Sequence, residues 1–173
     1  AAAPRLAGSV DTPGNALDVA VSGDFAYVAD LLSGLQVVEV SNPAAPAIVA
    51  NLAFQFGASR VAVEDTLAYV AASGGVLEIV GVSSPTAPSR LGSVDTGAGI
   101  RELAAAGTLA FVCDIADNLV VVDASDPRAP RVVSTTALGA LGLGVTAAGD
   151  RVLVGEGNGR VQIFDVSNPA SPQ

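Results

Sequence analysis

Residues 119–130 read Leu-Val-Val-Val-Asp-Ala-Ser-Asp-Pro-Arg-Ala-Pro, a β-prone run that leads through an acid into a turn with two prolines. The turn recurs along the chain, with Pro-x-x-Pro at positions 43/46, 85/88, 127/130 and 169/172. Each step is 42 residues, so the chain divides without gaps into units 5–46, 47–88, 89–130 and 131–172. A fixed period of this length indicates a repeat architecture in one domain, 1–173.

Short β-prone runs fill each unit and leave no segment long enough for a helix. In the first unit and the start of the second, the runs are 16–21, 25–29, 35–40 and 47–52. Ser22-Gly23-Asp24 and Ser33-Gly34 separate the first three runs and are typical of hairpin turns. Four antiparallel strands per repeat predict an all-β fold, a β-propeller whose four-stranded blades follow the units. A β-helix solenoid is the structural alternative, whereas a parallel α/β sheet needs longer crossovers.

The third run of each unit carries the pattern that is most specific for a known family. It reads Leu-Gln-Val-Val-Glu at 35–39, Leu-Glu-Ile-Val-Gly at 77–81, Leu-Val-Val-Val-Asp at 119–123 and Val-Gln-Ile-Phe-Asp at 161–165. A Ser, a small polar residue and Pro follow each run, and the chain resembles the LVIVD repeat over almost its whole length. The resemblance implies a β-propeller of bacterial or archaeal surface or secreted proteins, and an extracellular, cell-surface or periplasmic location. Gly81 departs from the pattern, so the acid is interpreted as a turn-stabilising group.

One strand is left over when the units are assigned to blades. Arg5–Val10 corresponds to the outer strand of a preceding unit, whereas the last unit supplies only three inner strands. Two arrangements remain open: a closed four-bladed ring completed by the N-terminal strand, or a segment of a larger ring of about 7–8 blades. Ala1–Pro4 aligns with the end of a unit, which suggests excision from a longer array. A mature N-terminus left by signal cleavage is the alternative.

The composition removes most catalytic chemistry. The 173 residues include no His, and all eight basic residues are Arg. Without His there is no Ser-His-Asp triad, and without Lys no Schiff base, so we expect a protein that is not an enzyme and carries no cofactor.

The net charge of −9 argues against nucleic acid as a binding partner. The uncharged stretches 40–59 and 132–149 contain Pro or several Gly, so no membrane span is expected. Cys113 shares a column with small residues and is expected to be a buried structural thiol.

Charged residues that break the repeat are the strongest candidates for a binding site. Asp18, Arg60, Arg101 and Glu102 lie at the start of the innermost strand, beside the expected central channel. These residues predict a site for a polar ligand or an ion at one mouth of the channel. The alternative is a set of ion pairs between blades, which satisfy one another and contribute little where they are solvated.

Two further groups of residues have weaker functional interpretations. Asp30, Asp114 and Glu156 share the column after the second strand, where three acids either attract a divalent cation such as Ca²⁺ or form solvated surface. Their spacing does not match Asp-x-Asp-x-Asp. Phe54 and Phe56 lie in a loop and form either an exposed interaction patch or a local cap over the blade edge.

The leading functional hypothesis is a non-enzymatic extracytoplasmic scaffold that binds other protein chains or copies of itself through open edge strands. It rests on the resemblance, on the missing catalytic residue types and on gap-free units that leave no long loop for an active site. The alternative is a carbohydrate-binding or carbohydrate-active propeller that uses Asp18, Glu102 and the two phenylalanines. Nothing in the spacing of the seventeen acids selects a glycosidase pair. A redox or metal partner is disfavoured by the absence of His.

Overall fold

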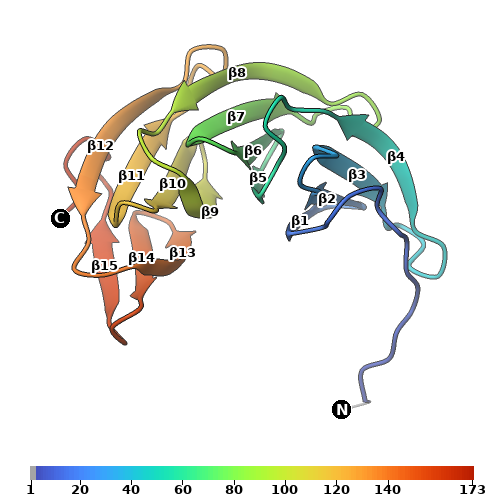
Figure 1. The fold of residues 1–173 in the computed structure, drawn as a ribbon, viewed down its shortest axis with the longest axis horizontal. Helices are drawn as coiled ribbons and strands as arrows, with labels where there is room; N and C mark the ends of the chain where they lie inside the picture. The colour runs from blue at the N-terminus through green and yellow to red at the C-terminus, as the bar shows by residue number, and fades with distance from the viewer. Residues whose placement is uncertain (1–2) are drawn as a thin grey trace.

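The computed structural model describes residues 3–173 as an open arc of four small antiparallel sheets, which we call blades 1 to 4 (Figure 1). Blade 1 contains β1 (Asp18–Ser22), β2 (Phe25–Ala29), β3 (Leu35–Glu39) and β4 (Ala47–Leu52). Blade 2 contains β5 (Arg60–Glu64), β6 (Leu67–Ala72), β7 (Val76–Gly81) and β8 (Ser89–Asp95). Blade 3 contains β9 (Ile100–Ala106), β10 (Leu109–Asp114), β11 (Asn118–Asp123) and β12 (Arg131–Ala137). Blade 4 contains β13 (Gly142–Ala148), β14 (Arg151–Glu156) and β15 (Val161–Asp165).

The strands follow the runs that the sequence predicts. In blade 1 each strand begins and ends within two residues of its predicted run, and consecutive strands pair antiparallel. Gly23 occupies the first hairpin turn with a φ of 57°, a conformation that glycine adopts without a steric penalty. The all-β propeller built from four units is therefore confirmed, and the solenoid alternative is wrong because every sheet is an antiparallel meander.

The apolar core lies between neighbouring blades. Tyr27, Leu35 and Val37 of blade 1 pack against Val61 and Val70 of blade 2. Burial of one such side chain contributes about 1.5–3 kcal/mol, so each junction between blades holds its two sheets together. Large aromatic side chains at the same position of successive repeats extend this core along the arc. Each of them is at most 2% exposed: Tyr27, Tyr69 and Phe111.

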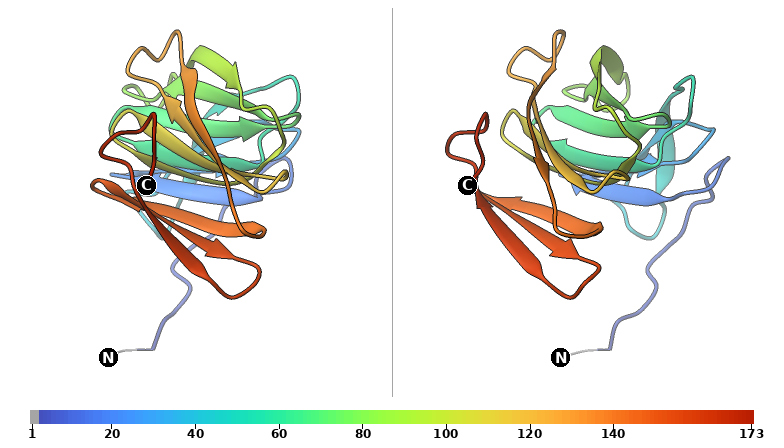
Figure 2. Two further views of the ribbon diagram at one scale, coloured as in Figure 1. Left: turned by 90° about the vertical axis from the view of Figure 1, so that its left-hand side faces the viewer. Right: turned by 60° about the vertical axis from the view of Figure 1, so that its left-hand side comes forward.

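The arc does not close on itself. Blades 1 to 3 have four strands, but blade 4 has three, and no strand of residues 3–173 pairs with the outer edge of β15 (Figure 1). Arg5–Val10 forms no strand and leaves blade 1 as an extended chain (Figure 2). The closed four-bladed arrangement is therefore wrong for this structure, because four blades packed in this way do not turn far enough for blade 1 to meet blade 4. The open segment is the arrangement observed.

Two further expectations concern the ends of the chain and the membrane. The prediction for Ala1–Pro4 includes Ala1 and Ala2, which lie outside the described residues. Within residues 3–173, no helix is long and apolar enough to cross a bilayer.

Two adjacent glycines in the turn between β6 and β7 provide a test of the packing between loops. Gly74 and Gly75 both have a φ of 84°, so alanine is strained at either position. A Cβ atom at Gly75 would also overlap the carbonyl oxygen of Ala98, whereas one at Gly74 would meet nothing within 4 Å. Urea unfolding should therefore show a loss of stability that is about 1–3 kcal/mol larger for Gly75→Ala than for Gly74→Ala. Equal losses would contradict the close approach of this turn to Ala98.

Candidate functional site

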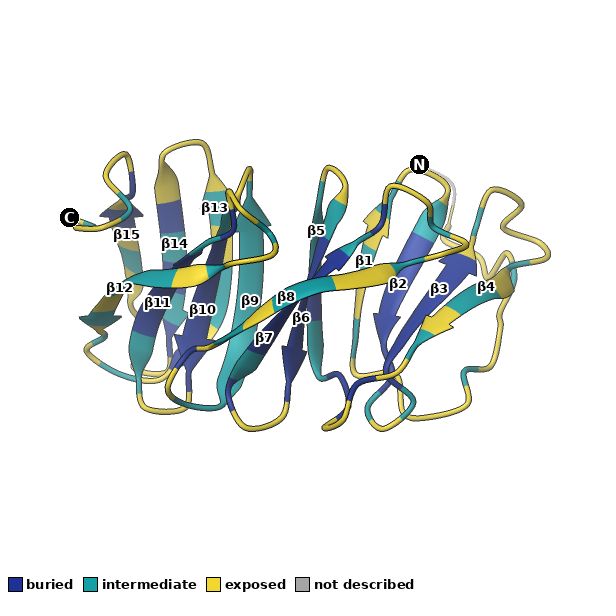
Figure 3. Ribbon diagram, turned by 90° about the horizontal axis from the view of Figure 1, so that it is seen from above, coloured by how far each residue is buried: buried dark blue, intermediate teal, exposed yellow. Residues whose placement is uncertain are grey.

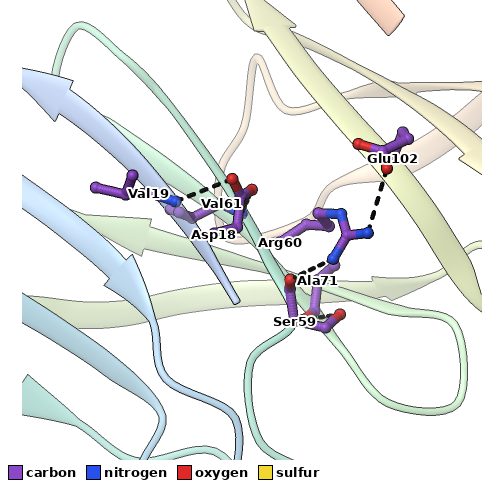
Figure 4. A network of polar contacts seen from close by, with 7 residues as sticks. All are labelled: Asp18, Val19, Ser59, Arg60, Val61, Ala71 and Glu102. Atoms are coloured by element: carbon purple, nitrogen blue, oxygen red, sulfur yellow. Dashed lines mark hydrogen bonds and ion pairs between the residues drawn. The ribbon is translucent and has the colours of Figure 1, made fainter. Parts of the chain in front are cut away.

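Three of the four charged candidates form a row across the innermost strands of blades 1, 2 and 3 (Figure 4). Asp18 accepts hydrogen bonds from the N–H groups of Val19 and Val61, both at 2.9 Å. Arg60 donates through Nη2 to Glu102 Oε1 at 3.2 Å and through Nη1 to the carbonyl oxygen of Ser59 at 2.8 Å. Asp18 thus links blade 1 to blade 2, and Arg60 with Glu102 links blade 2 to blade 3.

The row is a set of contacts between blades, and its charges are already engaged. The side chains of Arg60 and Glu102 are 29% and 30% exposed, so their ion pair contributes only about 0.2–1 kcal/mol. Arg101 lies outside the row, where the pairing of β9 with β10 is irregular. Its Nε is buried without a hydrogen-bond partner, and it forms no ion pair within residues 3–173.

The two contacts between blades in this row are expected to contribute unequally to the stability of the protein. Asp18→Ala should destabilise the protein by about 1–2 kcal/mol, because the N–H of Val61 loses its acceptor at the junction. Arg60→Ala breaks only a partly solvated ion pair and should cost less than about 1 kcal/mol. Chemical denaturation measures both values, with Asp18→Asn as the control because its amide oxygen still accepts the bond. A larger loss for Arg60→Ala than for Asp18→Ala would contradict these roles.

The three acids at the ends of β2, β10 and β14 are buried, at most 5% exposed. Each carboxylate accepts hydrogen bonds from loop N–H groups: Asp30 from Gly14, Asp114 from Ala116 and Asn118, and Glu156 from Gly139. The prediction of solvated surface is therefore corrected, because these oxygens satisfy the donors of the connecting loops. The three acids lie in separate blades, and residues 3–173 contain no group of three His, Cys, Asp or Glu side chains that could hold a metal ion.

The two phenylalanines in the loop between β4 and β5 differ in burial. Phe54 is 8% exposed and packs in the core between blades 1 and 2, whereas Phe56 is 51% exposed. The predicted patch of two aromatic residues is corrected to Phe56 alone, because the loop turns Phe54 inward onto the apolar junction.

Cys113 is fully buried, as predicted. Burial raises the pKa of its thiol to about 12, with a further contribution from the negative charges of Glu102 and Asp114.

The free face of blade 1 exposes apolar residues that other blades bury. Val19 is 57% exposed and Val21 is 66% exposed on β1. Val61, which takes the place of Val19 in blade 2, is 4% exposed because blade 1 covers it. A groove of about 420 Å³ lies on this face, between the N-terminal segment at Val10 and the side chains of β1 to β3. We call this surface the front face.

The opposite end of the arc carries a second exposed apolar surface, on blade 4. Val161 is 65% exposed and Ile163 is 61% exposed on β15. Their equivalents in blade 1, Leu35 and Val37, are fully buried against blade 2. Figure 3 shows this gradient, from the buried β7 and β10 in the middle of the arc to the partly exposed β1 and β15. We call this surface the back face.

Sequence reasoning identified the open edge strands but not these two faces. The signal was nevertheless present, because the apolar columns that form each junction also occur in the first and last units. Within residues 3–173 no blade covers the columns at the two ends of the arc, so their large apolar side chains are exposed.

The fold and the repeated strands define a class of protein, an arc of β-propeller blades. The family model of the LVIVD repeat matches residues 13–53, 57–96, 100–137 and 144–173. The chain therefore belongs to the LVIVD repeat family, as the resemblance implied. No curated protein is significantly similar to the chain in sequence.

Solved structures of low sequence identity share the fold. The computationally designed Ika4 protein superposes with a TM-score of 0.76 at 11% identity, over 95% of this chain and 99% of that one. The computationally designed Ika8 protein gives 0.73 at 11% identity, over 91% of this chain and 47% of that one. The β-propeller domain of Cps50 (Swd1) from Myceliophteria thermophila gives 0.73 at 11% identity, over 88% and 54%. The chain thus spans nearly all of Ika4 but about half the length of the other two.

Proposed function

We propose that the protein is a non-enzymatic scaffold that binds protein chains, a second copy of itself among them, through its front and back faces. The observation that carries this proposal is the exposure of Val19, Val21, Val161 and Ile163, which is 57–66%. Apolar side chains that gather on one surface favour contact with a protein partner over contact with water. Membership in a propeller repeat family supports the same function.

The polar residues support a scaffold more than an enzyme. Asp18 binds a backbone N–H of the next blade, and the Arg60 guanidinium pairs with Glu102. The carboxylates of the carbohydrate alternative are therefore engaged in links between blades, and only Phe56 remains as an exposed aromatic of its loop. The absence of His and Lys from the sequence supports the same choice.

An extracytoplasmic location is part of the proposal and rests on the family resemblance. Fractionation of the source organism, with an antibody against the chain, tests it. The protein is expected in the medium, on the cell surface or in the periplasm. Recovery in the cytoplasmic fraction alone would overturn this part of the proposal.

A charge on the back face tests the scaffold function directly. Ile163→Asp should reduce the mass in solution to the 17.0 kDa of one chain, because an aspartate buried in an apolar contact is strongly disfavoured. Ile115→Asp is the matched control, since Ile115 is 60% exposed but lies in a loop of blade 3. Sedimentation equilibrium of the wild type and both variants gives the masses. A wild type that stays at 17.0 kDa up to high concentration would contradict self-association.

A further inference from the structure

We propose that Arg101, near the start of β9, binds the carboxylate of an acidic peptide segment from a partner protein, and that Ile115 and Leu141 contact the apolar residues beside that acid. The site is separate from the front and back faces on which the proposed function rests. β9 lies between β5 of blade 2 and β13 of blade 4, so the surroundings of Arg101 do not depend on what lies beyond either end of the arc.

Arg101 is a partly buried cation that has no acid as its partner. Arg60 and Arg101 are the two arginines that are partly buried, and the other six are exposed. Arg60 pairs with Glu102, whereas Arg101 forms no ion pair within residues 3–173 and its Nε is buried without a hydrogen-bond partner. A charged group that loses water without gaining a partner is rare and costly. The side chain therefore has binding capacity that the described chain does not use.

The acids closest to Arg101 in the sheet are already bound to other donors. The carboxylate of Glu102 accepts from Arg60 of blade 2. Asp114, at the end of β10, accepts from the backbone N–H of Asn118 at 2.8 Å and from its Nδ2 at 2.9 Å. These two carboxylates hold blades and loops together, and neither of them forms an ion pair with Arg101. A carboxylate for this guanidinium has to come from a ligand.

An irregularity in the strand pairing presents the end of the Arg101 side chain. Glu102 is opposite Cys113 and Ile100 is opposite Asp114, so Arg101 is the extra residue of a bulge. A bulge changes the direction of the side chain that it carries. The Nε is buried, whereas the two Nη groups beyond it are not, so they form the open end of a fixed fork. Such a fork matches the two oxygens of a carboxylate.

Ile115 provides exposed apolar surface at this end of blade 3. Its backbone N–H donates to the carbonyl oxygen of Gly99 at 2.8 Å. A Cβ atom at Gly99 would lie 3.2 Å from Ile115 Cδ1, so the isoleucine side chain covers the loop that enters β9. Gly99 is two residues before Arg101, and Ile115 is 60% exposed. The apolar side chain and the cation therefore flank the same strand start.

Leu141 provides a second exposed apolar side chain from the loop that enters blade 4. It is 42% exposed and precedes Gly142, where a Cβ atom would lie 2.7 Å from Cys113 Sγ. Arg101 lies near the same thiol: burial raises the pKa of Cys113 to about 12, and the positive charge of Arg101 opposes that rise. Arg101 and Leu141 are thus neighbours across Cys113.

The charges around Arg101 determine which anion fits. A phosphate would bring about two negative charges close to Glu102 and Asp114, whereas a carboxylate brings one. The net charge of −9 repels anions at long range, but physiological salt screens exposed charges beyond about 8 Å, so direct contacts determine the affinity. Exposed Ile115 and Leu141 favour an acid with aliphatic neighbours over a small free acid. A peptide segment supplies both features.

A titration followed by NMR tests the site. The probe is the peptide N-acetyl-Leu-Glu-Leu amide, and N-acetyl-Leu-Gln-Leu amide is its neutral control. In a ¹H–¹⁵N correlation spectrum of arginine side chains, the Glu peptide should shift the Nε–H signal of Arg101 saturably. Its dissociation constant should be at least about ten-fold lower than that of the Gln peptide, because hydrogen bonds between charged groups are stronger. Arg101→Lys identifies the signal by its loss.

Arg128 is the internal control in the same spectrum. It is exposed, forms no ion pair within residues 3–173 and lies in the proline turn at the other end of β11. Its signal should not shift with the Glu peptide. An Arg101 signal that does not move, or that moves equally with both peptides or together with Arg128, would overturn the site. Acetate that binds as tightly as the Glu peptide would overturn the peptide as the ligand.

Variants separate the contributions of charge and apolar contact. Arg101→Gln should raise the dissociation constant of the Glu peptide at least about ten-fold, and Leu141→Ser should raise it roughly two- to five-fold. Arg128→Gln is the matched control and should leave it unchanged. The backbone amide signals of Gly99 and Ile115 report binding in all three variants. The comparison of the two peptides on the wild type tests the proposal even where a variant fails to fold.

Sedimentation distinguishes this site from the faces of the proposed function. Arg101→Gln should keep the mass in solution of the wild type, and Ile163→Asp should keep the shift of the Arg101 signal. Loss of peptide binding with unchanged self-association would overturn the inference alone. A wild type that stays one chain but binds the Glu peptide through Arg101 would overturn self-association and support this site. Loss of the peptide shift in Ile163→Asp would overturn the independence of the two surfaces.

Discussion

Face-to-face packing of neighbouring blades is the interaction on which the rest of the structure depends. Each sheet is too small to bury its own apolar residues, so both of its faces need a neighbour. Tyr27, Tyr69 and Phe111 fill successive layers and are almost completely buried. The arc, its curvature and its two exposed ends all follow from this single kind of contact, which the repeat supplies at each junction and leaves uncovered at both termini.

The sequence predicted the fold in detail because the repeat reports the same local structure four times. Strand boundaries, hairpin turns and the family resemblance all follow from columns in which residue types agree. Closure could not be predicted, because the angle between blades depends on how side chains such as Tyr69 pack against the next sheet. The burial of Phe54 also depended on packing between blades, which a loop sequence does not reveal.

For the polar residues, too, the sequence indicates which side chains are unusual but not which groups they bind. Asp18, Arg60 and Glu102 differ from the residues at the same position of other repeats, and the structure brings them into one row across three blades. Their partners could not be read from sequence, because Asp18 uses a backbone N–H. The sequence predicts that Asp30 is a surface acid or a cation ligand, yet in the structure it accepts hydrogen bonds from the loop that enters its own blade. Strand ends that leave N–H groups unpaired explain why acids recur in that column.

The 42-residue unit of sequence and the four-stranded unit of folding are out of phase by one strand, since each unit begins with the outer strand of the blade before it. A boundary between two sequence units therefore falls inside a blade, between its third strand and its outer strand. Insertion or loss of one whole unit would keep every internal blade intact and would change the arc only in length, by one blade.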